Sequence, residues 1–402
     1  MKNNDIFSDY KTPLEEILRD GARKLLQQAI ENEVDEYLEL YKNQKDEKGR
    51  RSVKRNGYLP KRQIQTGIGH LPVKQPRIRG RFFSSALLPK YMRRIPSIEA
   101  LISSLYLKGV STGDMQESLE AILGENAKGL SPANIVRFKE IWEKEYSAWC
   151  SRDLRMKKYV YLWADGIYFN IRLSDERPCL LVIIGATVDG TKELIAIHDG
   201  IRESKLSWKE TLQDLKRRGL SQSPWLAIGD GALGFWGALE EEFPACRHQR
   251  CWVHKTANIL DKMAKSSQRH AKELIHEMYL APTKEKGHKA FKSFLVLYEA
   301  KYPRACECLL KDQDKLFTFY DFPAQHWQHI RTTNPIESTF ATVRHRTKRT
   351  KGCGSRKATL SMVYKLGISA QKHWRKLRGY QQIVKVVQGI KFKDGEEVTK
   401  VA

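Results

Sequence analysis

Asp165 and Asp230 are each followed by glycine, and each comes after an apolar run typical of a buried strand. Mg²⁺ takes carboxylate oxygens as ligands in proteins, and because it keeps several waters, a few converging acidic side chains are enough to hold it. An Asp-Gly pair at the end of a strand is also a common turn. Either aspartate taken singly fits a turn better, so the order of the surrounding strands has to decide.

The apolar runs around the two aspartates predict an α/β fold. The expected elements are four strands with short antiparallel connections, one helix and a fifth strand, at 159–164, 167–173, 179–188, 193–198, 207–218 and 225–229. This is the element order of a ribonuclease-H-like core, in which the first strand and the strand after the helix are neighbours. We therefore expect Asp165 and Asp230, each at the end of a strand, to face each other.

Glu337 is the last acidic residue before a long stretch without any, since no carboxylate follows it until Asp394. Two divalent cations about 3.5–4 Å apart can cut a phosphodiester by gripping the attacking and leaving oxygens, and a third acid would complete their ligands. The local sequence offers another role, because Asn334 fits a helix N-cap, Pro335 the first helical position and Glu337 the partner in a capping box. The local pattern alone favours the cap.

The chain is strongly basic, with 71 Lys and Arg against 47 Asp and Glu and a net charge of +24. This surplus favours a polyanionic partner, most commonly nucleic acid, with an anionic membrane surface as the rival. No apolar stretch reaches the roughly 18 residues of a membrane span. Seven scattered cysteines and an amino terminus without an apolar signal region favour the reducing cytosol, and disulfides are not expected.

Two tracts contain no acidic residue at all: 48–98, with fourteen Lys or Arg, and 338–393, with fifteen. Both are typical of surfaces that face phosphates. Within the first tract, glycines and prolines between 51 and 94 predict short extended pieces, a small strand-and-loop module. Before it, apolar residues from 14 to 38 recur at helical spacing and predict an amphipathic helix that packs either within the chain or against a second subunit.

Residues 97–149 predict two helical segments separated by 123–130. Ser131 fits the N-cap of the second segment and Pro132 its first helical position. We interpret the pair as a helix-turn-helix-like unit in which Arg137 and Lys139 contact DNA, with an ordinary helix pair as the alternative.

After Asp230 the sequence predicts a helix at 235–242, a short strand at 246–250 and further helices from 254 to about 320. Most of this helical segment exceeds what the core needs, so we interpret it as an insertion domain. The expected domains begin with an N-terminal helix and basic DNA-binding module at 1–96 and a helix-turn-helix-like DNA-binding domain at 97–150. The catalytic core follows in two parts, at 151–253 and, with a basic tail, at 326–402. The α-helical insertion at 254–325 separates these two parts.

Four candidate zinc ligands, Cys246, His248, Cys251 and His254, fall within nine residues. Structural zinc sites usually join two ligand pairs from separated segments, whereas here both pairs share one short stretch. We therefore expect no zinc, and interpret these residues as buried cysteines and hydrogen-bonded histidines that shape the site.

The segment after Glu337 is densely basic. Helix faces exposed only to solvent normally mix acids with bases, and this one has no acids, so we expect it to hold the DNA backbone near the metals. The predicted contacts are Arg344, Arg346, Lys348, Arg349 and Lys351.

Together these motifs resemble the Mutator-type bacterial transposases of the insertion sequence 256 family, over most of the chain. The matching segments are 55–58, 106–112, 129–132, 164–166, 249–254, 321–323 and 331–337. The resemblance implies that Asp165, Asp230 and Glu337 form the catalytic triad, which overrides the capping role of Glu337. One departure is Gly231, where many relatives carry alanine.

The same resemblance implies that Cys251 and His254 form a Cys-x-x-His element near the active site, with Asn334 beside Glu337. The expected function is a DNA transposase that binds terminal inverted repeats and uses Mg²⁺, or Mn²⁺ in its place, for strand cleavage and transfer. It would act on double-stranded DNA as a homodimer or larger assembly, in the bacterial cytoplasm and on the nucleoid. The alternatives are a non-catalytic, sequence-specific DNA-binding regulator and a tyrosine recombinase that uses Tyr364.

Overall fold

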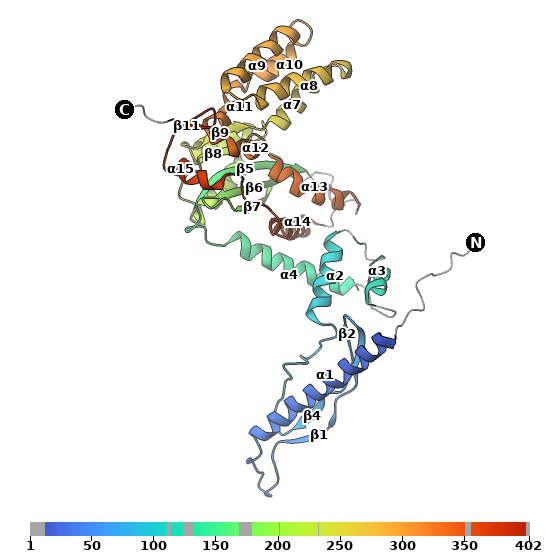
Figure 1. The fold of residues 1–402 in the computed structure, drawn as a ribbon. Helices are drawn as coiled ribbons and strands as arrows, with labels where there is room; N and C mark the ends of the chain where they lie inside the picture. Colours follow the sequence, from blue (N-terminus) through green and yellow to red (C-terminus); the bar gives the residue numbers. More distant parts are fainter. Residues whose placement is uncertain are drawn as a thin grey trace, which may run out of the picture. The chain divides into compact units, whose positions relative to one another are not determined.

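The computed structural model describes residues 13–108, 110, 114–123, 132–168, 179–200, 202–231, 233–349 and 355–398 (Figure 1). The predicted cap Ser131 and the predicted DNA contact Lys351 lie outside the described residues. Internal contacts divide the chain into two compact units, 1–138 and 139–402. No helix among the described residues is long and apolar enough to cross a membrane.

The first unit begins with a long helix and a set of short strands, as predicted. Helix α1 spans Pro13–Leu40, and the strands are β1 (Lys54–Tyr58), β2 (Arg62–Thr66), β3 (Gly69–Val73) and β4 (Pro76–Arg79). They form two antiparallel pairs, β1 with β4 and β2 with β3. Ile30 of α1 packs with Ile64, Val73 and Leu88. The amino-terminal half of the same helix exposes Leu14, Ile17, Leu18 and Leu25, so only part of its apolar face packs within the chain.

Three helices follow, rather than the two that were predicted: α2 (Pro96–Lys108), α3 (Asp114–Leu123) and α4 (Pro132–Cys150). The apolar pattern before residue 123 divides between α2 and α3 because each buries its own residues, Ile102 in α2 and Leu119 in α3. Pro132 is the first residue of α4, as expected.

The second unit is built on a mixed five-stranded sheet. Its strands are β5 (Tyr159–Tyr168), β6 (Cys179–Thr187), β7 (Lys192–Gly200), β8 (Leu226–Gly229) and β9 (Arg247–Arg250), in the order β7-β6-β5-β8-β9. The first three in the chain pair antiparallel, while β8 and β9 run parallel to β5. The chain is therefore α/β.

One strand boundary was predicted wrongly. The sequence predicted separate strands before and after Asp165-Gly166, but β5 runs through both residues. The reason is the pairing with β6, which continues across them as Asp165 with Val182 and Gly166 with Leu181. Because its hydrogen bonds to β6 continue, β5 stays extended through the Asp-Gly pair.

The two faces of the sheet are covered by different helices. Helices α5 (Lys205–Arg217) and α6 (Leu233–Glu242) pack on the face that carries Leu162 and Ala164. Alternate β5 residues face the other side, where the Tyr161 hydroxyl lies 2.8 Å from His326 Nδ1 and Trp163 Nε1 donates to the His329 carbonyl. Asp165 is the next residue on this second face.

Helices fill most of the chain after β9, as predicted. They are α7 (Trp252–Leu260), α8 (Lys265–Leu280), α9 (Lys284–Tyr298), α10 (Pro303–Leu310) and α11 (Gln313–Leu316), then η1 (Thr318–Asp321), η2 (Ala324–His326) and α12 (Trp327–Ile330). Figure 1 shows α8, α9 and α10 together in a helical lobe of this unit.

The chain then returns to the sheet. The last elements are α13 (Asn334–Arg349), α14 (Arg356–Gln371), η3 (Tyr380–Gln382), α15 (Ile383–Val387), β10 (Phe392–Lys393) and β11 (Glu396–Glu397). Helix α13 contacts β5 and α14 contacts β7.

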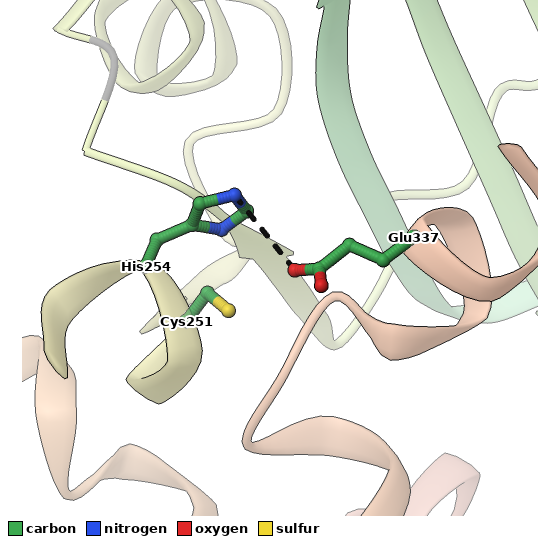
Figure 2. Close-up of side chains that lie close together, drawn as sticks. All are labelled: Cys251, His254 and Glu337. Carbon is green, nitrogen blue, oxygen red and sulfur yellow. Dashed lines mark ion pairs between the residues drawn. The ribbon is translucent and has the colours of Figure 1, made fainter. Parts of the chain in front are cut away.

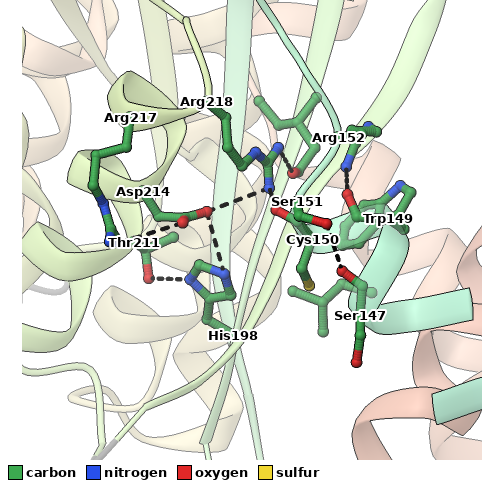
Figure 3. A network of polar contacts seen from close by, with 12 residues as sticks. Ser147, Trp149, Cys150, Ser151, Arg152, His198, Thr211, Asp214, Arg217 and Arg218 are labelled. Atoms are coloured by element: carbon green, nitrogen blue, oxygen red, sulfur yellow. Dashed lines mark hydrogen bonds and ion pairs between the residues drawn. The ribbon is translucent and has the colours of Figure 1, made fainter. Parts of the chain in front are cut away.

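A polar network fastens the end of α4 to the sheet (Figure 3). Arg218 donates to the Cys150 carbonyl, the Ile195 carbonyl and the Asp214 carboxylate, at 3.0, 3.0 and 3.3 Å. Nearby, Arg152 bridges the carbonyls of Trp149 and Leu194. Because both arginines satisfy backbone groups of α4 and of β7, they fix where the helix ends against the core.

The substitution R218A is expected to lower the free energy of unfolding by about 2–4 kcal/mol, since it leaves buried carbonyls without donors. The matched control is R217A. Arg217 binds the same Asp214, but its side chain is 76% exposed against 6% for Arg218, so its loss should cost less than about 0.5 kcal/mol. Urea unfolding of both variants measures the difference, and equal losses would contradict the assignment.

Candidate functional site

The parallel pairing of β5 with β8 brings the two aspartates together. Ala164 lies opposite Gly229 in the last registered pair, and the next residue on each strand is an aspartate. Asp165 is only 8% exposed, and Asp230 is half-buried at the point where β8 ends. The sequence prediction that their strands are neighbours is confirmed.

The electrostatics of Asp165 place further charges nearby. Burial raises its pKa to about 6; the charges of Asp230 and Glu337 push in the same direction, while His254 opposes them. A carboxylate whose pKa is raised by two other carboxylates lies among like charges. The charges of Asp230 and Glu337, both far from Asp165 in the sequence, thus act on the same buried carboxylate.

Glu337 reaches this site from the first turn of α13. The Thr333 carbonyl accepts the backbone N–H groups of Ile336 and Glu337 and so starts the helix. Glu337 Oε1 lies 3.1 Å from Thr333 Oγ1 and 3.7 Å from His254 Nε2 (Figure 2). The Asn334 N–H is directed to Thr332 Oγ1 at 3.5 Å. The Glu337 carboxylate thus faces His254, while exposed Asn334 opens the helix.

Cys251 and His254 form a polar pair beside Glu337. Burial alone would raise the pKa of Cys251, but hydrogen bonding to His254, the charge of His254 and hydrogen bonding from Thr333 outweigh burial and lower it. The hydrogen bond with Cys251 raises the pKa of His254 to about 9, with help from the charges of Cys251, Asp165 and Glu337. The pair therefore presents an imidazolium to the neighbouring carboxylates.

Thr333 connects the three side chains in Figure 2. Its backbone N–H donates to Cys251 Sγ, and its hydroxyl lies 3.3 Å from both Cys251 Sγ and His254 Nδ1. A hydroxyl has one hydrogen to donate, so it donates to Cys251 or to Glu337, one at a time. The Trp252 N–H donates to the Arg331 carbonyl, which holds the start of α7 against the segment that precedes α13.

The four Cys and His residues weighed as zinc ligands do not gather in one place. Cys246 Sγ contacts the Arg247 carbonyl, and the His248 ring packs on Trp236 with a centroid distance of 4.7 Å. Among the described residues, the acidic, Cys and His side chains whose donor atoms all lie within 4.8 Å of one another are Cys251, His254 and Glu337.

Sequence reasoning missed Glu203, which lies just before α5. Burial raises its pKa to about 7, and the charges of Asp230 and Asp165 add to this. A Cβ on Gly166 would overlap the Glu203 carboxylate, so the side chain lies directly against the residue after Asp165. The available signal was weak, because Glu203 is one of two acidic residues, with Asp199, between the predicted strand at 193–198 and the predicted helix at 207–218.

The predicted DNA contacts are only partly described. Arg137 is half-exposed and pairs with Glu99 of α2 at 2.6 Å, and Lys139 is half-buried in the second unit. Arg344, Arg346, Lys348 and Arg349 belong to the last turns of α13, but their side chains lie outside the described part of the structure.

The raised pKa of Asp165 predicts a stability cost in the metal-free protein. Its folded-state value of about 6 lies above the ordinary 3.8, so the ionised form opposes folding above pH 6, and the cost disappears as pH falls toward 4. D165N should therefore raise the free energy of unfolding by about 1–3 kcal/mol at pH 7.5 and by almost nothing at pH 4. Denaturant unfolding in EDTA at both pH values measures this, and a destabilised D165N at pH 7.5 would refute it.

Comparison with known proteins assigns the chain to a family. Residues 4–377 match the family described as "Transposase, Mutator family". The chain is 50% identical over 281 residues to the transposase for insertion sequence element IST2 of Acidithiobacillus ferrooxidans, covering 70% of this chain and 95% of that protein. It is 50% identical over 291 residues to the transposase for IS6120 of Mycolicibacterium smegmatis, covering 72% and 90%. It is 29% identical over 326 residues to the transposase for IS256 in transposon Tn4001 of Staphylococcus aureus, covering 80% and 81%. The chain therefore belongs to the Mutator family of transposases.

Proposed function

We propose that this protein is a DNA transposase that cuts the ends of an insertion sequence and joins them to target DNA, with Asp165, Asp230 and Glu337 as its catalytic carboxylates. The observation that carries the proposal is the parallel register of Ala164 with Gly229, which makes the aspartates neighbours, together with the charge of Glu337 acting on Asp165. The relatives' names as transposases for insertion sequences support the same activity.

A ribonuclease-H-like core is the finer fold that fits this activity. Three antiparallel strands, a helix and two parallel strands, in the order β7-β6-β5-β8-β9, support it. We propose the core at 151–253 and 326–402, interrupted by the helical insertion at 254–325.

The residues fit hard divalent cations. Carboxylate oxygens are the donors that Mg²⁺ and Mn²⁺ prefer, and buried Asp165 lies among like charges that a cation would relieve. When bound, two such cations supply the charge that stabilises the reacting phosphate and activates the attacking water or 3′-hydroxyl. We propose no zinc.

The protein's own residues hold these ligands in place. The charges of both Asp230 and Glu337 act on Asp165, and these three carboxylates would hold the cations as ligands. His254 lies beside Glu337 and balances its charge. Thr333 fixes Glu337 through its hydroxyl and fixes Cys251 through its backbone N–H.

DNA binding is the role we propose for the basic tracts. The strand-and-loop module and helices α2 to α4 would recognise the terminal inverted repeats. The Lys and Arg side chains of α13 would hold the DNA backbone near the cations. Cutting two ends together requires a dimer or a larger assembly, working on cytoplasmic DNA.

Two alternative functions, a non-catalytic DNA-binding regulator and a tyrosine recombinase, make different demands on the protein. A non-catalytic regulator would bind DNA without any need for metal. A tyrosine recombinase would need an accessible nucleophile, whereas Tyr364 is 9% exposed and its ring packs on Tyr146 and Trp149 at centroid distances of 5.7 and 5.2 Å.

The test is nicking and strand joining of a labelled duplex that carries the element's end, with Mg²⁺ or with EDTA. D165N, D230N and E337Q should each lower the cleavage rate by more than about 100-fold, because each removes a cation ligand. Mn²⁺ should replace Mg²⁺ for the wild-type protein.

The control is D261N, at an exposed aspartate of the same unit, which should cut normally. DNA binding without metal-dependent cleavage by the wild-type protein would favour the regulator, and normal cleavage by E337Q would remove Glu337 from the triad.

A further inference from the structure

Glu203 is a carboxylate of the site that the proposed mechanism leaves without a role. It precedes Ser204, whose hydroxyl caps α5 by accepting the Ser207 N–H, and so it stands at the entrance of a helix that packs along α6. The charges that act on it most are those of Asp230 and then Asp165. Its position is therefore set by the same elements that position the aspartates.

Two glycines allow Glu203 to come this close. A Cβ on Gly234, in the first turn of α6, would lie 2.7 Å from Lys205 N and 2.8 Å from Ser204 C. The turn that carries Glu203 is thus packed against the helix that follows Asp230. On the other side, the Glu203 carboxylate occupies the space that a side chain at Gly166 would fill.

The contact with Gly166 is made where β8 has already ended. Residue 166 faces the side of β5 that carries α5 and α6, opposite to Asp165. The last residue of β5 that pairs with β8 is Ala164, opposite Gly229. Beyond Ala164, β8 no longer stands beside β5 to separate one face of the sheet from the other. Glu203 therefore meets the aspartates from the α5 side.

We propose that Glu203 is a fourth carboxylate of the metal site and takes part in binding the cations that Asp165 and Asp230 hold. This inference rests on the proposed function. Two neighbouring bases, Lys205 and Lys209, pair with Glu241 instead of Glu203, at 2.5 and 2.7 Å.

The test measures Mn²⁺ binding to the full-length protein by isothermal titration calorimetry and by the EPR signal of free Mn²⁺. E203Q should weaken binding of at least one Mn²⁺ by about 10- to 100-fold. E203D, which keeps the charge on a shorter side chain, should bind Mn²⁺ more tightly than E203Q but more weakly than the wild type. The control variant E210Q, which changes an exposed glutamate of α5, should bind Mn²⁺ like the wild type.

G166A provides a second variant that leaves Glu203 in the sequence. Gly166 lies within β5 without a left-handed backbone, so alanine fits the backbone but displaces the Glu203 carboxylate. It should weaken Mn²⁺ binding in the same direction as E203Q, and it decides the question if E203Q does not fold. Wild-type Mn²⁺ binding by a folded E203Q or, failing that, by G166A would overturn the proposal.

Failure of the proposed function gives a different pattern. If D165N and D230N lose both Mn²⁺ binding and DNA cleavage while E203Q keeps both, the triad stands and the role of Glu203 is refuted. If D165N and D230N keep both, the proposed function fails, and the role of Glu203 fails with it.

Discussion

The parallel pairing of β8 with β5 is the constraint on which the rest of the site depends. With Ala164 opposite Gly229, the residues that come next are both acidic; Asp165 is buried and Asp230 is half-buried. Burial is the main cause of the raised pKa of Asp165, and the like charges of Asp230 and Glu337 add to it. Folding places the carboxylates where they repel one another, and a cation is the partner that relieves the repulsion. This is how a functional site lowers the stability of the fold that carries it.

The surrounding elements keep that arrangement rigid. On one face, Tyr161 and Trp163 bind the segment that leads into α13 through His326 and the His329 carbonyl, which carries Glu337 toward Asp165. On the other face, α5 and α6 pack over Leu162 and Ala164. Trp236 Nε1 donates to the Asp230 carbonyl, so the turn after β8 is fixed as well. Each acidic side chain therefore approaches the site on a regular element or directly beside one.

Much of this could be predicted from the sequence because it depends on local patterns. Apolar runs and turn residues predicted the strand order, and that order made Asp165 and Asp230 neighbours. The break at Asp165-Gly166 was predicted wrongly, because an Asp-Gly pair resembles a turn unless the hydrogen bonds to β6 are known. The direction of Glu337 depends on its contact with His254, and the presence of Glu203 depends on its contact with Gly166. In both cases the partner is distant in the sequence. No local pattern contains such contacts.

The most direct test of the central claim is anomalous diffraction from crystals of the protein soaked in Mn²⁺. The account predicts a peak with oxygen atoms of both Asp165 and Asp230 about 2.1 Å away, on the edge of β5 that β8 leaves open beyond Gly229. A peak bound only by Cys251, His254 and Glu337, the tighter cluster of donor atoms, would contradict it. So would Mn²⁺-soaked crystals with no peak near either aspartate.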